Sequence, residues 1–156
     1  MNPSPMPSAP RGGADDATLF LRLALGVVFV YHALLKLVVF TLPGTVAFFE
    51  SAGLPGFAAY PVFALELAAG LLLVAGFQTR WAALAIVPVM LGAITVHWGN
   101  GFSFDRPGGG WEYPAFLAVI GLALFLVGDD GPLSAGRALL RSRRPAAPRA
   151  LGPQPR

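Results

Sequence analysis

The chain has 156 residues, of which 55% are hydrophobic and only 12% are charged, and it contains no cysteine. A soluble domain has about a quarter charged residues, so this composition and a mean hydropathy of +0.64 indicate a membrane protein. The absence of cysteine excludes disulfides, thiol redox chemistry and thiolate metal sites. The net charge of +3 does not indicate nucleic-acid binding, because the arginines gather in a tail beside a hydrophobic body.

Four apolar runs predict four transmembrane helices, over about residues 18–42, 57–77, 80–98 and 112–128. Short connections join them, which favours an all-α, up-down-up-down bundle over residues 18–130. Residues 1–17 are rich in Pro, Ser and Gly and predict a disordered tail. Residues 131–156 predict a basic juxtamembrane helix and a second disordered tail. Small residues that would let helices approach closely are Gly26, Ala64, Ala68, Gly70, Gly92 and Gly121.

Basic residues predict the orientation of this bundle. The positive-inside rule assigns the side richer in arginine to the cytoplasm. Both termini are then cytoplasmic, and the topology anchors on that side are Arg22, Arg80, Arg137 and Arg141.

The first apolar run differs from a plain membrane anchor, because it carries His32 and Lys36 within it. The two residues are four apart and therefore share one face of a helix. Ionisable groups at membrane depth usually face protein or water and are candidates for functional sites. At 1.5 Å per residue, Lys36 lies about 9 Å and Glu66 roughly 10–14 Å below the outer surface.

Two further ionisable residues lie at the same surface, since His97 ends the third run and Glu112 begins the fourth. We therefore expect a polar pocket in the outer half of the bundle, formed by His32, Lys36, Glu66, His97 and Glu112. Each residue also has a simpler interpretation. Lys36 could snorkel to the headgroups or pair structurally with Glu66. His32 could hydrogen-bond a neighbouring helix, and the other two could be ordinary interfacial residues.

Other kinds of site are not indicated. No helix carries two metal ligands at i, i+3 or i, i+4 spacing, and Lys36 would repel a cation beside His32, so we expect no metal site. Nucleophile–base constellations, phosphate-binding loops and dinucleotide fingerprints are not sensibly placed, so no catalytic residue is assigned.

Six motifs occur in order over roughly residues 20–128. They are R-L-x-L-G-x-x-F-x-x-H-x-x-x-K (22–36), G-L-P (53–55), E-L-x-x-G-L-L-L (66–73), G-x-x-T-R-x-A-A (76–83), V-H-x-x-x-G-F (96–102) and G-G-x-E-Y-P (109–114). Together they resemble the DoxX family. The resemblance implies a small, multi-pass protein of the prokaryotic cytoplasmic (inner) membrane with four transmembrane helices. It also implies a link to membrane oxidoreductase complexes, since the family name comes from a subunit associated with a thiosulfate:quinone oxidoreductase.

These observations favour an accessory membrane subunit of a quinone-linked oxidoreductase, whose polar pocket binds a quinone or a small acidic substrate. In this hypothesis His32 and Glu66 relay protons to a bound quinone and Lys36 polarises one of its oxygens. His97 and Glu112 connect the pocket to the outer solution. The chain has no intrinsic redox group, so electrons must come from a bound cofactor or a redox partner subunit.

Two alternatives remain open from the residues alone. A non-catalytic scaffold or assembly protein would use Lys36 and Glu66 only to join helices and would use its basic tail to attract anionic lipid or a partner. A small-solute transporter is disfavoured by a single short bundle without broken helices, although a homo-oligomer could supply a pathway.

Overall fold

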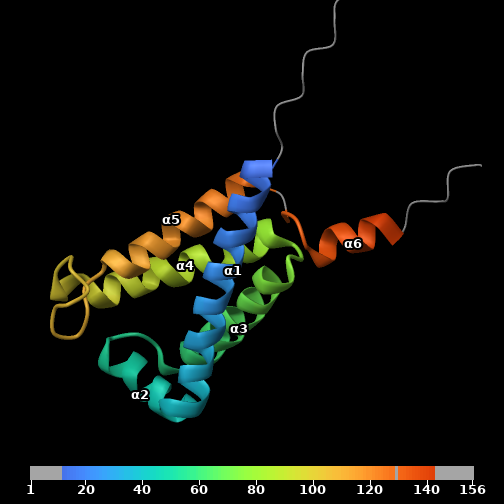
Figure 1. Cartoon of the computed structure of the whole chain (residues 1–156). Helices are drawn as coiled ribbons and strands as arrows, with labels where there is room; N and C mark the ends of the chain where they lie inside the picture. Colours follow the sequence, from blue (N-terminus) through green and yellow to red (C-terminus); the bar gives the residue numbers. More distant parts are fainter. Residues whose placement is uncertain (1–11, 129, 143–156) are drawn as a thin grey trace, which may run out of the picture.

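The computed structural model describes residues 12–128 and 130–142, which form helices joined by loops, with no strand among them (Figure 1). Three helices are long and apolar enough to cross a membrane, over Gly13–Val39, Gly56–Ala75 and Thr79–Asn100. A shorter apolar helix covers Glu112–Val127. The chain is therefore an all-helical, multi-pass membrane protein in the part that is described. Residues 1–11 and 143–156, which hold most of the two predicted tails, lie outside it.

The helical elements follow one another with short connections. In chain order they are α1 (Gly12–Leu34), the π-helical η1 (Leu35–Val39), α2 (Leu42–Ser51), the 3-10 turn η2 (Gly56–Ala58), α3 (Ala59–Ala75), α4 (Thr79–His97), the 3-10 turn η3 (Trp98–Asn100), α5 (Glu112–Val127) and α6 (Ala135–Ser142). The helices predicted over 57–77, 80–98 and 112–128 thus compare with α3, α4 and α5.

The first helix differs from its predicted range of 18–42 at both ends. It begins at Gly12, so residues 12–17, assigned from composition to a disordered tail, are helical. Asp15 lies in the first turn, where a carboxylate is favoured by the helix dipole, and it also pairs with Arg137 at 3.6 Å. At the other end, the regular α-helix gives way at Leu34 to the wider π turn of η1.

The helices pack as two pairs, α1 with α3 and α4 with α5, and small residues bring each pair together. A Cβ added to Gly26 would lie 2.9 Å from the carbonyl oxygen of Gly70, so these two backbones touch. In the second pair, a Cβ on Gly121 would lie 3.1 Å from the carbonyl oxygen of Ala83. Gly92 has nothing within 4 Å of its Cβ position. It therefore serves no close helix contact, although its size suggested one.

The two pairs form a wedge. They join where α3 turns into α4, beside α6, and they diverge toward α2 and the loop 98–111 (Figure 1). We call the joined end the α6 end and the open end the α2 end. Near the junction the wedge is filled by a core in which the most deeply buried large side chains include Leu25, Phe29, Leu73, Ile86 and Leu124.

Arg22 closes the α6 end from inside, with 1% of its surface exposed. Its guanidinium donates to four backbone carbonyls, those of Leu73, Val74, Pro132 and Leu133, at 2.8–3.0 Å. The first two belong to the last turn of α3, whose final carbonyls have no partner within the helix. The other two belong to the segment that leads to α6. One buried cation thus ties three parts of the chain together.

Asp130 adds a second connection at this end. Its Oδ1 accepts a hydrogen bond of 2.9 Å from the backbone N–H of Thr79 and so caps α4. The N–H of Gly136 in α6 donates to the carbonyl of Gly76 at 3.1 Å. The segment before α6 is therefore part of the folded domain.

The contact between α1 and α3 can be tested with matched substitutions. Gly26→Ala should lower the free energy of unfolding by about 1–3 kcal/mol, because its methyl group would press on the backbone of α3. Gly92→Ala should be neutral or slightly stabilising, because the site is open and Ala is the better helix former. Denaturant unfolding in detergent measures both. Equal stability of the two variants would contradict the close contact.

The closure by Arg22 is tested by Arg22→Lys. Lysine keeps the charge, but a single ammonium cannot reach four carbonyls, so we expect a loss of at least about 2 kcal/mol in unfolding free energy. Arg80→Lys is the control, because the exposed Arg80 lies over the faces of Trp81 and Phe125 and should lose less than about 1 kcal/mol. Similar losses in the two variants would contradict the special role of Arg22.

Candidate functional site

A cavity of about 570 Å³ lies between the two helix pairs at the α2 end. All of the helices α1 to α5 contribute to its wall, and most of the lining side chains are apolar. The polar side chains in the wall are His32, Lys36, Glu66, His97 and Tyr113. The cavity is therefore mostly apolar with a few polar groups, which is the usual composition of a small-molecule site.

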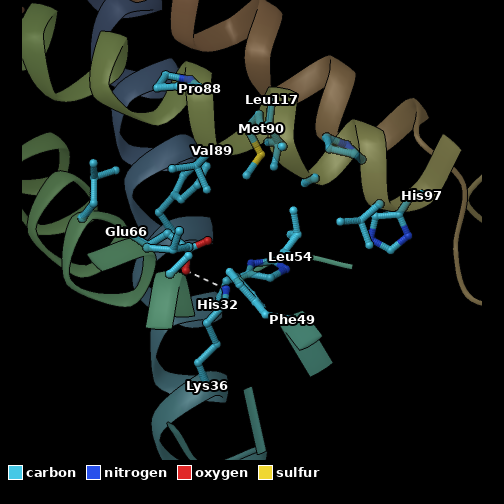
Figure 2. A pocket seen from close by; sticks show the side chains of 18 of the residues that line it. His32, Lys36, Phe49, Leu54, Glu66, Pro88, Val89, Met90, His97 and Leu117 are labelled. Carbon is cyan, nitrogen blue, oxygen red and sulfur yellow. Dashed lines mark hydrogen bonds and ion pairs between the residues drawn. The ribbon is translucent and has the colours of Figure 1, made fainter. Parts of the chain in front are cut away.

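The most polar feature of the wall is an ion pair between α1 and α3. Lys36 Nζ lies 2.6 Å from Glu66 Oε2, and the two side chains are 18% and 4% exposed (Figure 2). Lys36 belongs to the π turn η1, and π turns often occur at functional sites. A charge in apolar surroundings is tolerated when it is paired, so each residue here satisfies the other.

His32 lies beside this pair, one turn earlier on α1 (Figure 2). Its Nδ1 is 2.8 Å from the carbonyl oxygen of Val28. A carbonyl can only accept, so Nδ1 carries the hydrogen and Nε2 is the nitrogen left to exchange a proton. The ring centroid is 6.2 Å from that of Tyr113, which connects α1 to α5 across the cavity.

The facing wall comes from the α4–α5 pair. Pro88, Val89 and Met90 of α4 and Leu117 of α5 lie across from the ion pair (Figure 2). Pro88 has no N–H and interrupts the hydrogen bonding of α4 in mid-helix. This wall offers apolar surface and no charge.

Helix α2 covers the open side of the cavity. Its Phe48 and Phe49, with Leu54 just after it, belong to the wall. The helix packs mainly on η1, η2 and α3, which lie on the side of the ion pair. It starts after Thr41, whose φ of 60° and ψ of 157° fall in a region that strongly favours glycine. This backbone costs about 1–3 kcal/mol, so the start of α2 is under strain.

Four of the five predicted pocket residues line this one cavity, namely His32, Lys36, Glu66 and His97. His97 lies toward the loop, where its Nδ1 donates to the carbonyls of Gly108 and Gly109 at 3.0 and 3.2 Å. Glu112 does not line it. Its Oε1 accepts from the N–H of Phe104 at 3.1 Å, so the folded loop holds this carboxylate away from the other four.

Two parts of the site were missed by reasoning from the sequence. A tyrosine at the start of an apolar run is typical of the aromatic belt at the membrane interface, yet Tyr113 lines the cavity and faces His32. Its place next to Glu112, at the same end of the bundle, was the available signal. Residues 45–52 predict a short surface helix whose phenylalanines dip into the membrane interface, so the helix is expected, but the place of α2 in the cavity wall is not.

The predicted topology anchors have different surroundings. Arg22 is buried rather than interfacial, while Arg80 is exposed and lies over the rings of Trp81 and Phe125. Arg137 pairs with an aspartate of α1. Arg141 lies in α6, and its side chain is outside the described part.

The arrangement can bind a neutral molecule with hydrogen-bonding oxygens. Lys36 uses one of its three donor hydrogens on Glu66, which leaves donors for a ligand. His32 Nε2 can accept or return a proton. Within residues 12–128 and 130–142, no group of three or more His, Asp or Glu side chains is arranged to hold a metal ion.

Comparison with known proteins finds a family match over residues 17–98, to the family described as DoxX. A protein of Bacillus subtilis (strain 168) named "Putative oxidoreductase CatD" is 40% identical over 80 residues. That stretch is 51% of this chain and 58% of the relative, so the chain spans little more than half of the relative's length. No solved structure matches the chain. The family match includes His32, Lys36, Glu66 and His97 and ends before Tyr113.

The ion pair predicts strong coupling between its two residues. Lys36→Met leaves a buried carboxylate and Glu66→Leu leaves a buried ammonium, so each should lower the unfolding free energy by about 3–5 kcal/mol. The double variant removes both charges and should lose much less than the sum of the two single losses. Denaturant unfolding of the four proteins in detergent measures the coupling. Additive losses would show that the two side chains do not interact.

Proposed function

Because the chain belongs to the DoxX family, we propose that it is a membrane subunit of a quinone-linked oxidoreductase and that its cavity binds the quinone head. The word oxidoreductase in the name of the Bacillus subtilis relative supports the class of reaction. The alignment covers about half of each protein, so transfer of an activity from that relative is part of the proposal. The location that goes with it is a prokaryotic inner membrane.

The observation that carries the proposal is the cavity itself. A volume of about 570 Å³ lies within the range of roughly 300–1,000 Å³ that small-molecule sites occupy. Its apolar walls suit a ring with a hydrocarbon tail, and its polar groups are concentrated on the α1–α3 side. A quinone has this division between an apolar body and carbonyl oxygens.

The charge of the ion pair favours a neutral ligand over an acidic one. Lys36 and Glu66 are 2.6 Å apart and together carry no net charge. An anionic ligand would gain Lys36 only at the cost of facing Glu66 in surroundings of low dielectric. A carbonyl oxygen can instead accept one of the spare hydrogens of Lys36 while the pair stays intact.

The same residues can handle the protons of the reaction. Reduction of a quinone adds two electrons and two protons, and the protons go to its carbonyl oxygens. His32 exchanges one proton at Nε2, and Glu66, held by Lys36, is the second group of the wall able to carry one. The electrons come from a redox cofactor or a partner subunit, since no residue of this chain supplies them.

The proposal includes four membrane spans, α1, α3, α4 and α5, with both termini in the cytoplasm. The exposed or half-buried arginines Arg80 and Arg137 lie at the α6 end, which the positive-inside rule assigns to the cytoplasm. The cavity then opens toward the outer side. α5 is short for a span, which a thin bilayer or a small tilt accommodates.

A scaffold role is the competing function, and one observation favours it. The Lys36–Glu66 pair joins α1 to α3 directly, as a purely structural pair would. In that case the cavity would be a by-product of the wedge, and removal of both charges together would leave the function of the protein intact.

The test uses a photoreactive quinone analogue with the purified full chain in lipid nanodiscs. We expect labelling in the cavity wall that unlabelled quinone competes away. His32→Ala and Glu66→Gln should each lower it roughly tenfold, because each removes a hydrogen bond to or near the quinone head. Glu50→Gln is the control, since Glu50 is an exposed carboxylate of α2 outside the cavity wall.

If the two cavity variants are labelled as strongly as the unchanged protein, quinone binding at this site is refuted. A folded Lys36→Met, Glu66→Leu protein that supports normal quinone-linked turnover by its partner would favour the scaffold role instead.

A further inference from the structure

The loop between α4 and α5 has a fixed shape despite its many glycines. Trp98 and Trp111, at its two ends, stack with ring centroids 5.1 Å apart. The side-chain amide of Asn100 donates to the carbonyls of Gly108 and Gly109 at 3.1 and 2.8 Å. These contacts close the loop at its base, so side chains carried by the loop are held in place.

The closed loop brings two phenylalanines to the carboxylate of Glu112. The N–H of Glu112 donates to the carbonyl of Phe102 at 2.9 Å. In return, the N–H of Phe104 donates to Glu112 Oε1 at 3.1 Å. Phe102 also packs edge-on against Trp111, with centroids 4.7 Å apart. The backbone of the loop therefore determines where both rings lie relative to the carboxylate.

These residues form a second pocket, of about 360 Å³, lined by Phe102, Phe104, Glu112, Tyr113 and Phe116. Four of the five lining residues are aromatic and the fifth is an acid. Phe104 and Phe116 are 69% and 61% exposed, so the pocket is open to a ligand from outside. Glu112 Oε2 has no hydrogen-bond partner among the described residues. Tyr113 is shared with the larger cavity, but the other four residues are not.

The chemistry of this lining selects a cation. The faces of aromatic rings carry negative partial charge and attract ammonium groups, and recognition of quaternary ammonium is the best-known use of such a cage. Glu112 adds a full negative charge, which would repel an anion and would stay unbalanced beside an apolar ligand. In the part of the chain that is described, the cation–π contacts belong to Arg80 at the α6 end, so these rings hold no basic side chain of their own.

We infer that this second pocket binds an organic cation of the alkylammonium class, with the ammonium over the aromatic rings and beside Glu112. The ligand is either a small soluble ammonium compound or the headgroup of a zwitterionic lipid. The inference does not depend on quinone binding, because it uses neither the ion pair nor His32.

The test compares choline with its neutral carbon isostere 3,3-dimethylbutan-1-ol, on the purified full chain in a detergent without ammonium groups. We expect saturable binding of choline in the millimolar range. Calorimetry measures this binding, and so does tryptophan fluorescence, because Trp111 touches Phe102. The isostere has the same shape without the charge, so it should bind roughly tenfold more weakly.

Two variants with one control locate the site. Glu112→Gln keeps an oxygen to accept from Phe104 and should preserve the loop, but it should weaken choline roughly tenfold. Phe104→Leu should weaken it severalfold. Phe20→Leu is the control, because Phe20 is a 70% exposed ring of α1 outside this pocket, and it should change nothing. Choline and isostere binding alike, or choline binding unaffected by Glu112→Gln and Phe104→Leu, would overturn the inference.

Nanodiscs distinguish the two sources of the ammonium group. If a lipid headgroup fills the pocket, choline should bind in discs of phosphatidylglycerol and fail to bind in discs of phosphatidylcholine. If the ligand is soluble, choline should bind in both. If choline binds in neither kind of disc, the inference is overturned, even if choline binds in detergent.

Discussion

A charge in apolar surroundings is costly unless an opposite charge pairs with it. This requirement determines the arrangement of the α2 end of the protein. Lys36 and Glu66 meet at 2.6 Å, and for that η1 and the middle of α3 must stay adjacent. The widened turn η1 places the lysine there. Both charges belong to one helix pair, and Pro88, Val89, Met90 and Leu117 of the other pair lie across from them. The resulting cavity carries its two charges on one wall and mostly apolar side chains on the other, and this division underlies its proposed ligand.

The wedge shape has an equally simple cause in residue size. Gly26 and Gly70 let α1 and α3 touch backbone to backbone, and Gly121 does the same for α5 against α4. Each pair is thus tight within itself, while larger side chains such as Leu25 and Ile86 fill the space between the pairs near the α6 end. Toward α2 the pairs diverge further and nothing from the helices fills the gap. Helix α2, which packs mainly on η1, η2 and α3, covers the gap.

Much of this could be predicted from the sequence, because hydropathy and helical spacing act locally. The all-helical class, the long apolar helices and the similar depth of Lys36 and Glu66 follow from counting residues along each run. The π turn could not be predicted, since no residue type encodes it. The position of Glu112 along its helix predicts its depth in the membrane but not the direction of its side chain. Its carboxylate accepts a hydrogen bond from the N–H of Phe104 in the loop and so lies outside the cavity wall. Arg22 was interpreted as an interfacial anchor because its partners are backbone carbonyls, which any sequence provides.

Those partners of Arg22 also impose an order in time. A ribosome makes α1 first, but the carbonyls of Pro132 and Leu133 lie 110 and 111 residues further along the chain. Domains form from the N-terminus during synthesis, so the nascent first helix carries a guanidinium whose set of acceptors does not yet exist. It can complete its hydrogen bonds only after residue 133 has been synthesised. The hydrogen bonds of the buried arginine are therefore completed late, and a chain truncated before residue 132 would lack two of its four acceptors.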